Sequence, residues 1–93
     1  MEEIVVAIAR VVKSKKSNKT IITYIKPEAD TEYVKGGLEL VNFYDNTEII
    51  DRVTHEDLLK PLRGKYTWEA GYNGTAKMKV VELYNANGVN ILA

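Results

Sequence analysis

The chain has 93 residues, enough for one domain with one hydrophobic core but too few for an enzyme with a deep, walled cleft. Its apolar share of 45% and charged share of 28% are close to globular averages, which excludes disordered and fibrous classes. The net charge of zero conceals a separation along the chain, because residues 1–26 carry +4, residues 27–59 carry −7 and residues 60–93 carry +3. The sequence therefore predicts a single domain over residues 1–93 with basic and acidic parts.

The first third of the chain predicts a long β-hairpin with a basic tip. Residues 4–12 are almost all apolar, as expected for a strand that two packed sheets share or that curls within a small barrel. Residues 20–26 return as its partner and end at Pro27, which has no amide hydrogen for a central ladder. The tip carries Lys13, Lys15, Lys16 and Lys19. Crowded like charges gain little unless an anion binds them, so the tip predicts contact with a phosphate backbone; the alternative is a solvated tip that discourages edge pairing.

The next segment, residues 27–37, predicts an acidic loop that ends in two glycines. Its carboxylates Glu28, Asp30 and Glu32 either face the solvent or bind a basic protein partner.

Residues 38–44 predict a third strand, and residues 47–53 are a candidate for a further short strand. Thr54 then has the features of a helix N-cap, because acidic residues follow it in the first turn. Leu58 and Leu59 give this short helix a small apolar face, and it ends by Gly64.

The last third predicts a second hairpin, with strands over residues 65–70 and 75–84. The pair Asn73-Gly74 between them suits the positive φ angles of a type I′ turn. Residues 89–92 are a candidate for a short edge strand.

The predicted order is three strands, a short helix and a two-stranded hairpin, so the fold class is mainly β. This is the order of a five-stranded OB-like Greek-key barrel with one short helix between strands 3 and 4. Together with the long first strand, the basic first hairpin and the sequence Asn18-Lys19-Thr20, it resembles the small OB-fold single-stranded DNA-binding proteins of phages and plasmids. The additional strands at 47–53 and 89–92 depart from that pattern and leave an SH3-like or other small barrel open.

Binding of single strands without sequence preference needs cations along the backbone path and aromatic rings on which bases stack. The sequence offers both, since Tyr66 and Trp68 alternate along one strand and Lys77 and Lys79 alternate along the next. The candidate phosphate contacts are Lys13, Lys15, Lys16, Lys19, Lys26, Lys77 and Lys79, and the candidate stacking rings are Tyr24, Tyr66, Trp68 and Tyr72. For the tryptophan, the alternative is a core position, which is the commoner place for the only tryptophan of a small domain.

No motif predicts catalysis, a metal site or a cofactor. His55 is the only histidine and the chain has no cysteine, so a triad or a strong metal site has no sequence support. Two glutamates near the start and the lack of an apolar run of about 20 residues predict a soluble, unprocessed protein, and the absence of cysteine fits a cytoplasmic location. The alternative function is a β-barrel interaction module that binds a protein through the acidic segment or a strand edge. Either function is compatible with a homo-oligomer, most simply a dimer.

Overall fold

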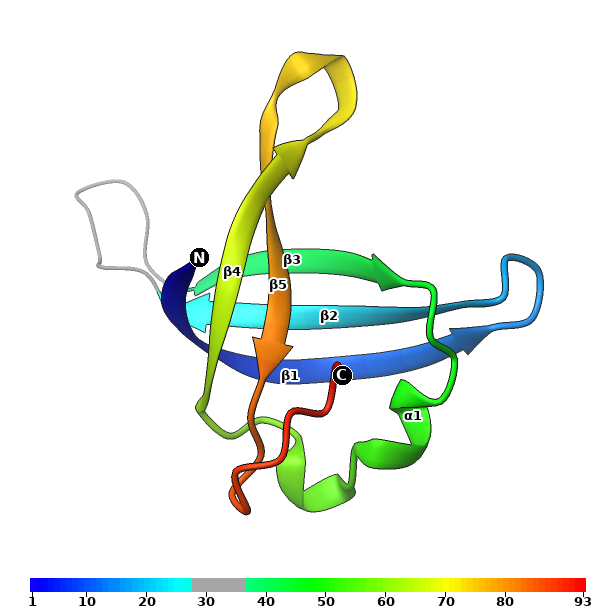
Figure 1. Cartoon of the computed structure of the whole chain (residues 1–93), viewed down its shortest axis with the longest axis vertical. Helices are drawn as coiled ribbons and strands as arrows, with labels where there is room; N and C mark the ends of the chain where they lie inside the picture. The colour runs from blue at the N-terminus through cyan, green and yellow to red at the C-terminus, as the bar shows by residue number, and fades with distance from the viewer. Residues whose placement is uncertain (28–36) are drawn as a thin grey trace.

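The computed structural model describes residues 1–27 and 37–93, and its strands form one strongly curled antiparallel sheet (Figure 1). The strand order is β3-β2-β1-β4-β5. The elements in chain order are β1 (Glu2–Ser14), β2 (Lys19–Pro27), β3 (Gly37–Tyr44), α1 (Ile49–Arg52), the 3-10 turn η1 (His55–Asp57), β4 (Leu62–Ala70), η2 (Tyr72–Gly74) and β5 (Ala76–Leu83). The predicted class, a mainly β five-stranded fold with a short helix between strands 3 and 4, is confirmed.

Strand β1 joins the two halves of the sheet. Its residues 2–6 pair with β4 and its residues 7–14 pair with β2, as the apolar character of both of its faces predicted. The pairing shifts by one residue between Ile8 and Arg10, so Ala9 is an extra, bulged residue. This bulge reverses the alternation of the strand, and Arg10 therefore faces the solvent while Val11 packs against the core.

The two edge strands of the sheet, β3 and β5, do not pair through their main chains. The curl of the sheet brings them close together, and side chains connect them there. Asn42 on β3 is completely buried, donates through Nδ2 to the carbonyl of Met78 at 3.0 Å and accepts from the amide of Val80 at 2.9 Å. The Tyr44 hydroxyl donates to the carbonyl of Val80 at 2.7 Å. These contacts between β3 and β5 are called the seam. The amide of Asn42 takes the place that a main-chain peptide would have in a ladder and closes the barrel there.

Tyr24 is completely buried beneath the seam. Its hydroxyl lies 2.7 Å from the hydroxyl of Tyr44. The Tyr24 hydroxyl is the donor in this pair, because the Tyr44 hydroxyl donates its own hydrogen to the carbonyl of Val80 on β5. Burial raises the pKa of both tyrosines, and for Tyr24 the nearby Tyr44 adds to the rise. The prediction of Tyr24 as a stacking ring is therefore wrong, because the ring packs in the core and no base reaches it.

The connection from β3 to β4 contains a short helix in the region where the sequence suggested a further strand. Residues 49–52 form α1, with Ile49 buried in the core, so the candidate strand at 47–53 is wrong. Asp57 accepts from the amide and the hydroxyl of Thr54 at 2.9 and 3.2 Å, which caps η1 as predicted. Leu58 packs against the core, whereas Leu59 is 70% exposed, and β4 begins at Leu62, earlier than expected.

The two chain segments after Ala70 fold back in different ways. At the β4–β5 turn, Asn73 and Gly74 have φ angles of 59° and 75°, the pair of positive values that the sequence predicted. After β5, the candidate edge strand at 89–92 is wrong, because only the single bridge between Tyr84 and Asn90 forms there. Ile91 is completely buried, so this tail fills the bottom of the core.

We expect Asn42→Leu to destabilise the protein strongly. The substitution keeps the side chain's approximate volume but leaves the Met78 carbonyl and the Val80 amide without partners at the seam. Each unsatisfied buried group costs about 1–3 kcal/mol, so the free energy of unfolding from urea titration should fall by about 2–4 kcal/mol. Glu39→Ala, an exposed change on the same strand, is the control and should alter it by less than about 0.5 kcal/mol. An Asn42→Leu protein as stable as this control would contradict the role of the seam.

The buried tyrosines predict loss of stability at alkaline pH. The folded chain keeps the Tyr24 hydroxyl protonated, while the unfolded chain ionises it near the ordinary pKa of 10.0. This stabilisation is complete below that pH, and the free energy of unfolding should decrease between about pH 10 and pH 12. Urea titrations across this range should give a smaller decrease for Tyr24→Phe, which has no hydroxyl to ionise. Equal decreases for the two proteins would show that Tyr24 is not held as a buried neutral group.

Candidate nucleic-acid interface

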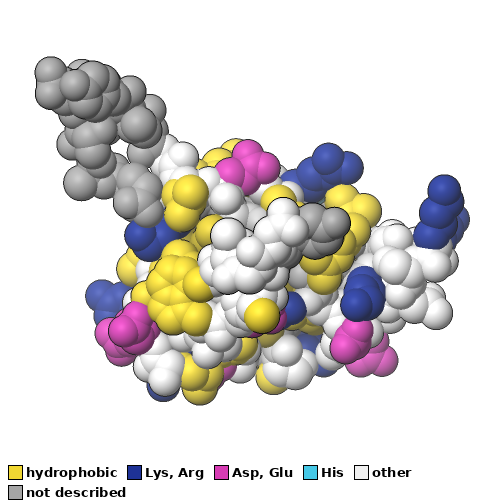
Figure 2. Space-filling model, turned by 90° about the horizontal axis from the view of Figure 1, so that it is seen from above, with side chains coloured by type: hydrophobic (Ala, Val, Ile, Leu, Met, Phe, Trp, Pro, Cys, Tyr) yellow, Lys and Arg dark blue, Asp and Glu magenta, His cyan; other side chains and the backbone are white. Residues whose placement is uncertain are grey.

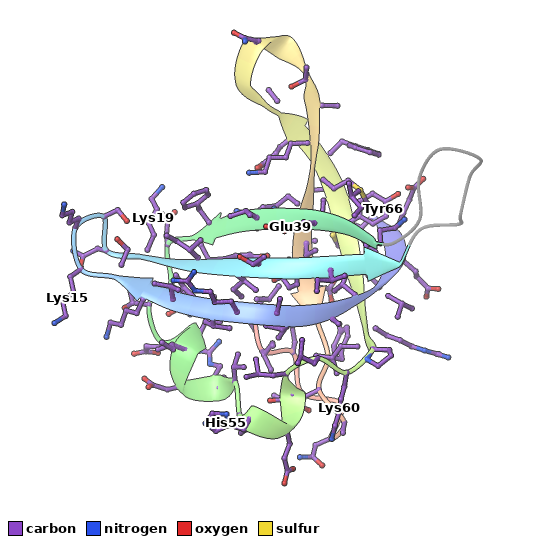
Figure 3. The ribbon with its side chains drawn as sticks, turned by 180° about the vertical axis from the view of Figure 1, so that it is seen from behind. Lys15, Lys19, Glu39, His55, Lys60 and Tyr66 are labelled. Atoms are coloured by element: carbon purple, nitrogen blue, oxygen red, sulfur yellow. The ribbon has the colours of Figure 1, made fainter. Side chains whose placement is uncertain are left out.

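The candidate interface begins on the side of β1, β2 and β3 that faces away from the core, here called the outer face. Residues directly opposite each other in a ladder share a face, and three cross-strand rows lie on this one. The rows are Val12–Ile21–Phe43, Arg10–Thr23–Val41 and Ala7–Ile25–Glu39. Figure 3 views these strands from that side, with Glu39 in the middle of β3. An outer face made largely of apolar and β-branched side chains is unusual for the solvent side of a sheet and suggests a surface that binds something.

Phe43 is the only aromatic residue of these rows, and a lysine lies over it. Its side chain is 45% exposed, and the Lys77 ammonium, which reaches across from β5, lies 5.5 Å from the centre of its ring. Lys79 lies 4.4 Å from the centre of the Tyr44 ring and also donates to the carbonyl of Phe43. Both lysines are thus held at the seam by the neighbouring aromatic residues. An exposed ring with an ammonium group close to it can stack a base and contact the adjoining phosphate.

A second aromatic group lies on the other side of the β3 edge. Trp68 on β4 is 56% exposed, and the Tyr66 ring meets it edge-to-face, with ring centres 5.7 Å apart. The hydroxyl of Tyr66 donates to the Glu2 carboxylate, and this bond raises the pKa of the tyrosine. The two rings share a face, as predicted, but Trp68 is a surface residue rather than the core residue that its scarcity favoured.

The lysine-rich tip lies at the far end of the β1–β2 ribbon. Figure 3 shows Lys15 and Lys19 at one end of the ribbon and Tyr66 near the other. Lys19 forms an exposed ion pair with Asp45 at 3.6 Å, while Lys13, Lys15 and Lys16 are exposed to solvent. Exposed pairs of this kind contribute little to stability, so Lys19 can exchange Asp45 for another anion at little cost.

Between the two ends of the ribbon, exposed hydrophobic side chains lie near basic side chains. Viewed from above, Figure 2 shows exposed hydrophobic side chains lying between groups of lysine and arginine side chains. Phe43 is opposite Ile21, two residues along β2 from Lys19, so the ring is next to the basic tip. Phe43 thus lies between the basic tip and the seam lysine Lys77.

The remaining predicted site residues are placed differently from expectation. Lys26 is at the opposite end of β2 from the tip and is paired with Leu38. Simple alternation would place Lys77 and Lys79 on one face with Val81 and Leu83. They lie on the opposite side from Leu83, because the β4–β5 pairing shifts at Tyr66 and leaves Val81 without a direct partner. Leu83 is buried as a result. The side chain of Tyr72 and the acidic residues Glu28, Asp30 and Glu32 lie outside the part of the chain that the structure describes.

Sequence reasoning missed two residues of the surface, Phe43 and Arg10. The alternation Leu40, Asn42, Tyr44 would have placed Phe43 on the opposite, outer side of its strand. Its meeting with Lys77, however, depends on the curl of the sheet and has no local signal. Arg10 faces outward only because of the bulge at Ala9, which the sequence does not mark.

Other kinds of site find no support in residues 1–27 and 37–93. No group of three side chains suited to hold a metal ion occurs there, and the only histidine, His55, is exposed on η1. Among the same residues, no helix is long and apolar enough to cross a membrane.

Comparison with known proteins found no matching family model, no matching curated protein and no matching solved structure. The resemblance to phage and plasmid single-stranded DNA-binding proteins consequently stays a prediction from the residues and the order of elements.

Proposed function

We propose that the protein binds single-stranded nucleic acid, DNA in the first instance, without strong sequence preference. The observation that carries this proposal is Phe43, an exposed ring on an apolar sheet face with the Lys77 ammonium 5.5 Å from its centre. A base has a flat face whatever its identity, so stacking on such a ring is tolerant of sequence. The lysine supplies the charge that the adjoining phosphate requires.

The charge distribution supports a path for the strand. The exposed tip lysines Lys13, Lys15 and Lys16 attract phosphates at one end, and Arg10 and Lys19 border the row that contains Phe43. Lys79 has one N–H donated to the Phe43 carbonyl, and its ammonium group has further donors for a phosphate. Net charge is zero, so attraction must come from this local cationic surface rather than from the molecule as a whole.

Fluorescence anisotropy of a labelled oligo-dT, titrated at several salt concentrations, tests the proposal directly. We expect saturable binding that weakens as salt rises and is tighter than binding of duplex DNA of equal length. An oligo-U of the same length shows whether the protein discriminates RNA from DNA. Absence of single-strand binding at low salt would refute the proposal.

The double variant Lys15→Ala/Lys16→Ala tests the basic tip. If both lysines contact phosphates, the slope of log affinity against log salt becomes shallower by about 1.4, or about 0.7 per contact on a single strand. Lys60→Ala is the matched control, because this exposed lysine lies near η1, away from the tip (Figure 3). An unchanged slope in the double variant would remove the tip from the interface.

Phe43→Ala tests stacking on the outer face. A stacked base contributes about 1–3 kcal/mol, so affinity for oligo-dT should fall roughly 5- to 150-fold with little change in the salt slope. Val89→Ala removes a comparably exposed apolar side chain elsewhere and should leave affinity unchanged. Both variants should keep the wild-type circular dichroism, since neither side chain belongs to the core. Wild-type affinity in Phe43→Ala would exclude this ring from the site.

The second candidate function, an interaction module for another protein, is favoured by the same apolar outer face. It would use this face or the acidic segment for a protein partner, and self-association into a dimer remains a prediction under either function. Failure of all single strands to bind, while the outer face is still protected in hydrogen exchange by a protein partner, would favour this second function.

A further inference from the structure

A cleft opens where β3 and the β4–β5 hairpin separate. Its volume is about 340 Å³, and its lining includes Leu38 and Leu40 from β3, Trp68 from β4, and Thr75, Lys77 and Met78 from the other side of the hairpin. The seam holds β3 against β5 at Asn42, whereas beyond it the hairpin rises away from the barrel (Figure 1). The cleft is the space left between the two elements.

The walls of this cleft are largely apolar. Trp68 is 56% exposed and Leu38 is 42% exposed. Both are nevertheless on the side of their strands that faces the core farther along, near Asn42 on β3 and near Tyr66 on β4. Tyr66 contacts Trp68 edge-to-face and supports the indole ring. Exposed apolar side chains that line a cleft, rather than being scattered singly, indicate a binding site.

We propose that this cleft takes one unpaired base of the bound strand, inserted against the indole of Trp68. The inference rests on the proposed function and adds a second, deeper base site to the one at Phe43. The volume is at the lower end of the range of small-ligand pockets, which is about 300–1,000 Å³, and suits a single flat heteroaromatic ring.

Lys77 connects the two base sites. It lines the cleft and also lies over the Phe43 ring, so it is between Phe43 and Trp68 on the molecular surface. A phosphate bound at Lys77 would have one neighbouring base on Phe43 and the other in the cleft. The strand thereby crosses the edge of β3 at the seam.

The chemistry of the lining determines which bases can enter. Leucine, methionine and tryptophan side chains make up much of the lining. The cleft therefore offers few hydrogen-bonding partners to the edge of a base and accepts any of the four bases. A base can enter only after leaving its stack and its pairing partner, which a duplex resists. The cleft therefore provides discrimination of single strands from duplexes without discrimination of sequence.

The tryptophan itself is the probe of this site, because Trp68 is the only tryptophan of the chain. Its emission is followed while the full-length protein is titrated with oligo-dT, and with an abasic sugar-phosphate chain of equal length. We expect oligo-dT to quench Trp68 and the abasic chain, bound through the lysines at low salt, to leave the emission unchanged. Equal quenching by both chains would overturn the inference, since no base would then be needed.

Ala76→Leu blocks the cleft without removing any contact of the fold. Ala76 is an exposed residue of the lining, so added bulk there should exclude a base. We expect at least a roughly 5-fold loss of affinity for oligo-dT, an unchanged salt slope and no quenching of Trp68. Ala86→Leu adds the same bulk at an exposed turn outside this cleft and should behave as wild type.

The outcomes separate this inference from the proposed function. Tight binding of oligo-dT with unquenched Trp68, or with full affinity in Ala76→Leu, would refute base insertion while leaving single-strand binding intact. Failure of wild-type protein to bind any single strand would refute both.

Discussion

The seam between β3 and β5 is the interaction on which the rest of this structure depends. A small antiparallel sheet that does not close by a continuous ladder has two free edges, and free edges invite pairing with other chains. Here the buried amide of Asn42 bonds to both the Met78 carbonyl and the Val80 amide, and the Tyr24–Tyr44 pair supports it from within. A fully satisfied polar cluster of this kind holds the curl of the sheet in one arrangement, because its alternatives leave buried polar groups without partners.

The candidate site follows from the position of that seam. It brings Lys77 over Phe43 and Lys79 over Tyr44, although each lysine is more than thirty residues from its ring in the chain. Because the seam joins only part of the two strands, they separate beyond Leu40 and leave the cleft beside Trp68. The same contacts thus stabilise the barrel and position both aromatic surfaces, so a change at Asn42 should disturb the candidate site as well as folding.

The charges that the sequence separates along the chain are only partly separated in space. The basic tip and the seam lysines border the exposed apolar surface, while Asp51 and Glu56 are exposed on the helical connection below the barrel. A neutral protein can still attract an anion through a local group of cations.

The sequence by itself determined the five strands of the sheet and their order along the chain, the turn at Asn73-Gly74, the capped turn after Thr54 and the basic tip. All of these rest on local chemistry: alternation of apolar residues, positive φ at a turn, a capping side chain and like charges close together. It also identified Trp68, Tyr66, Lys77 and Lys79 as surface candidates. It misplaced Tyr24, missed Phe43 and Arg10, and assigned strands to residues 47–53 and 89–92. The outward position of Arg10 depended on the bulge at Ala9, and the meeting of Lys77 with Phe43 depended on which distant strands the curl brings together. Only the tertiary structure decides these, because a one-residue shift in pairing reverses every side chain that follows it, and the contacts that set the shift come from residues far away in the chain.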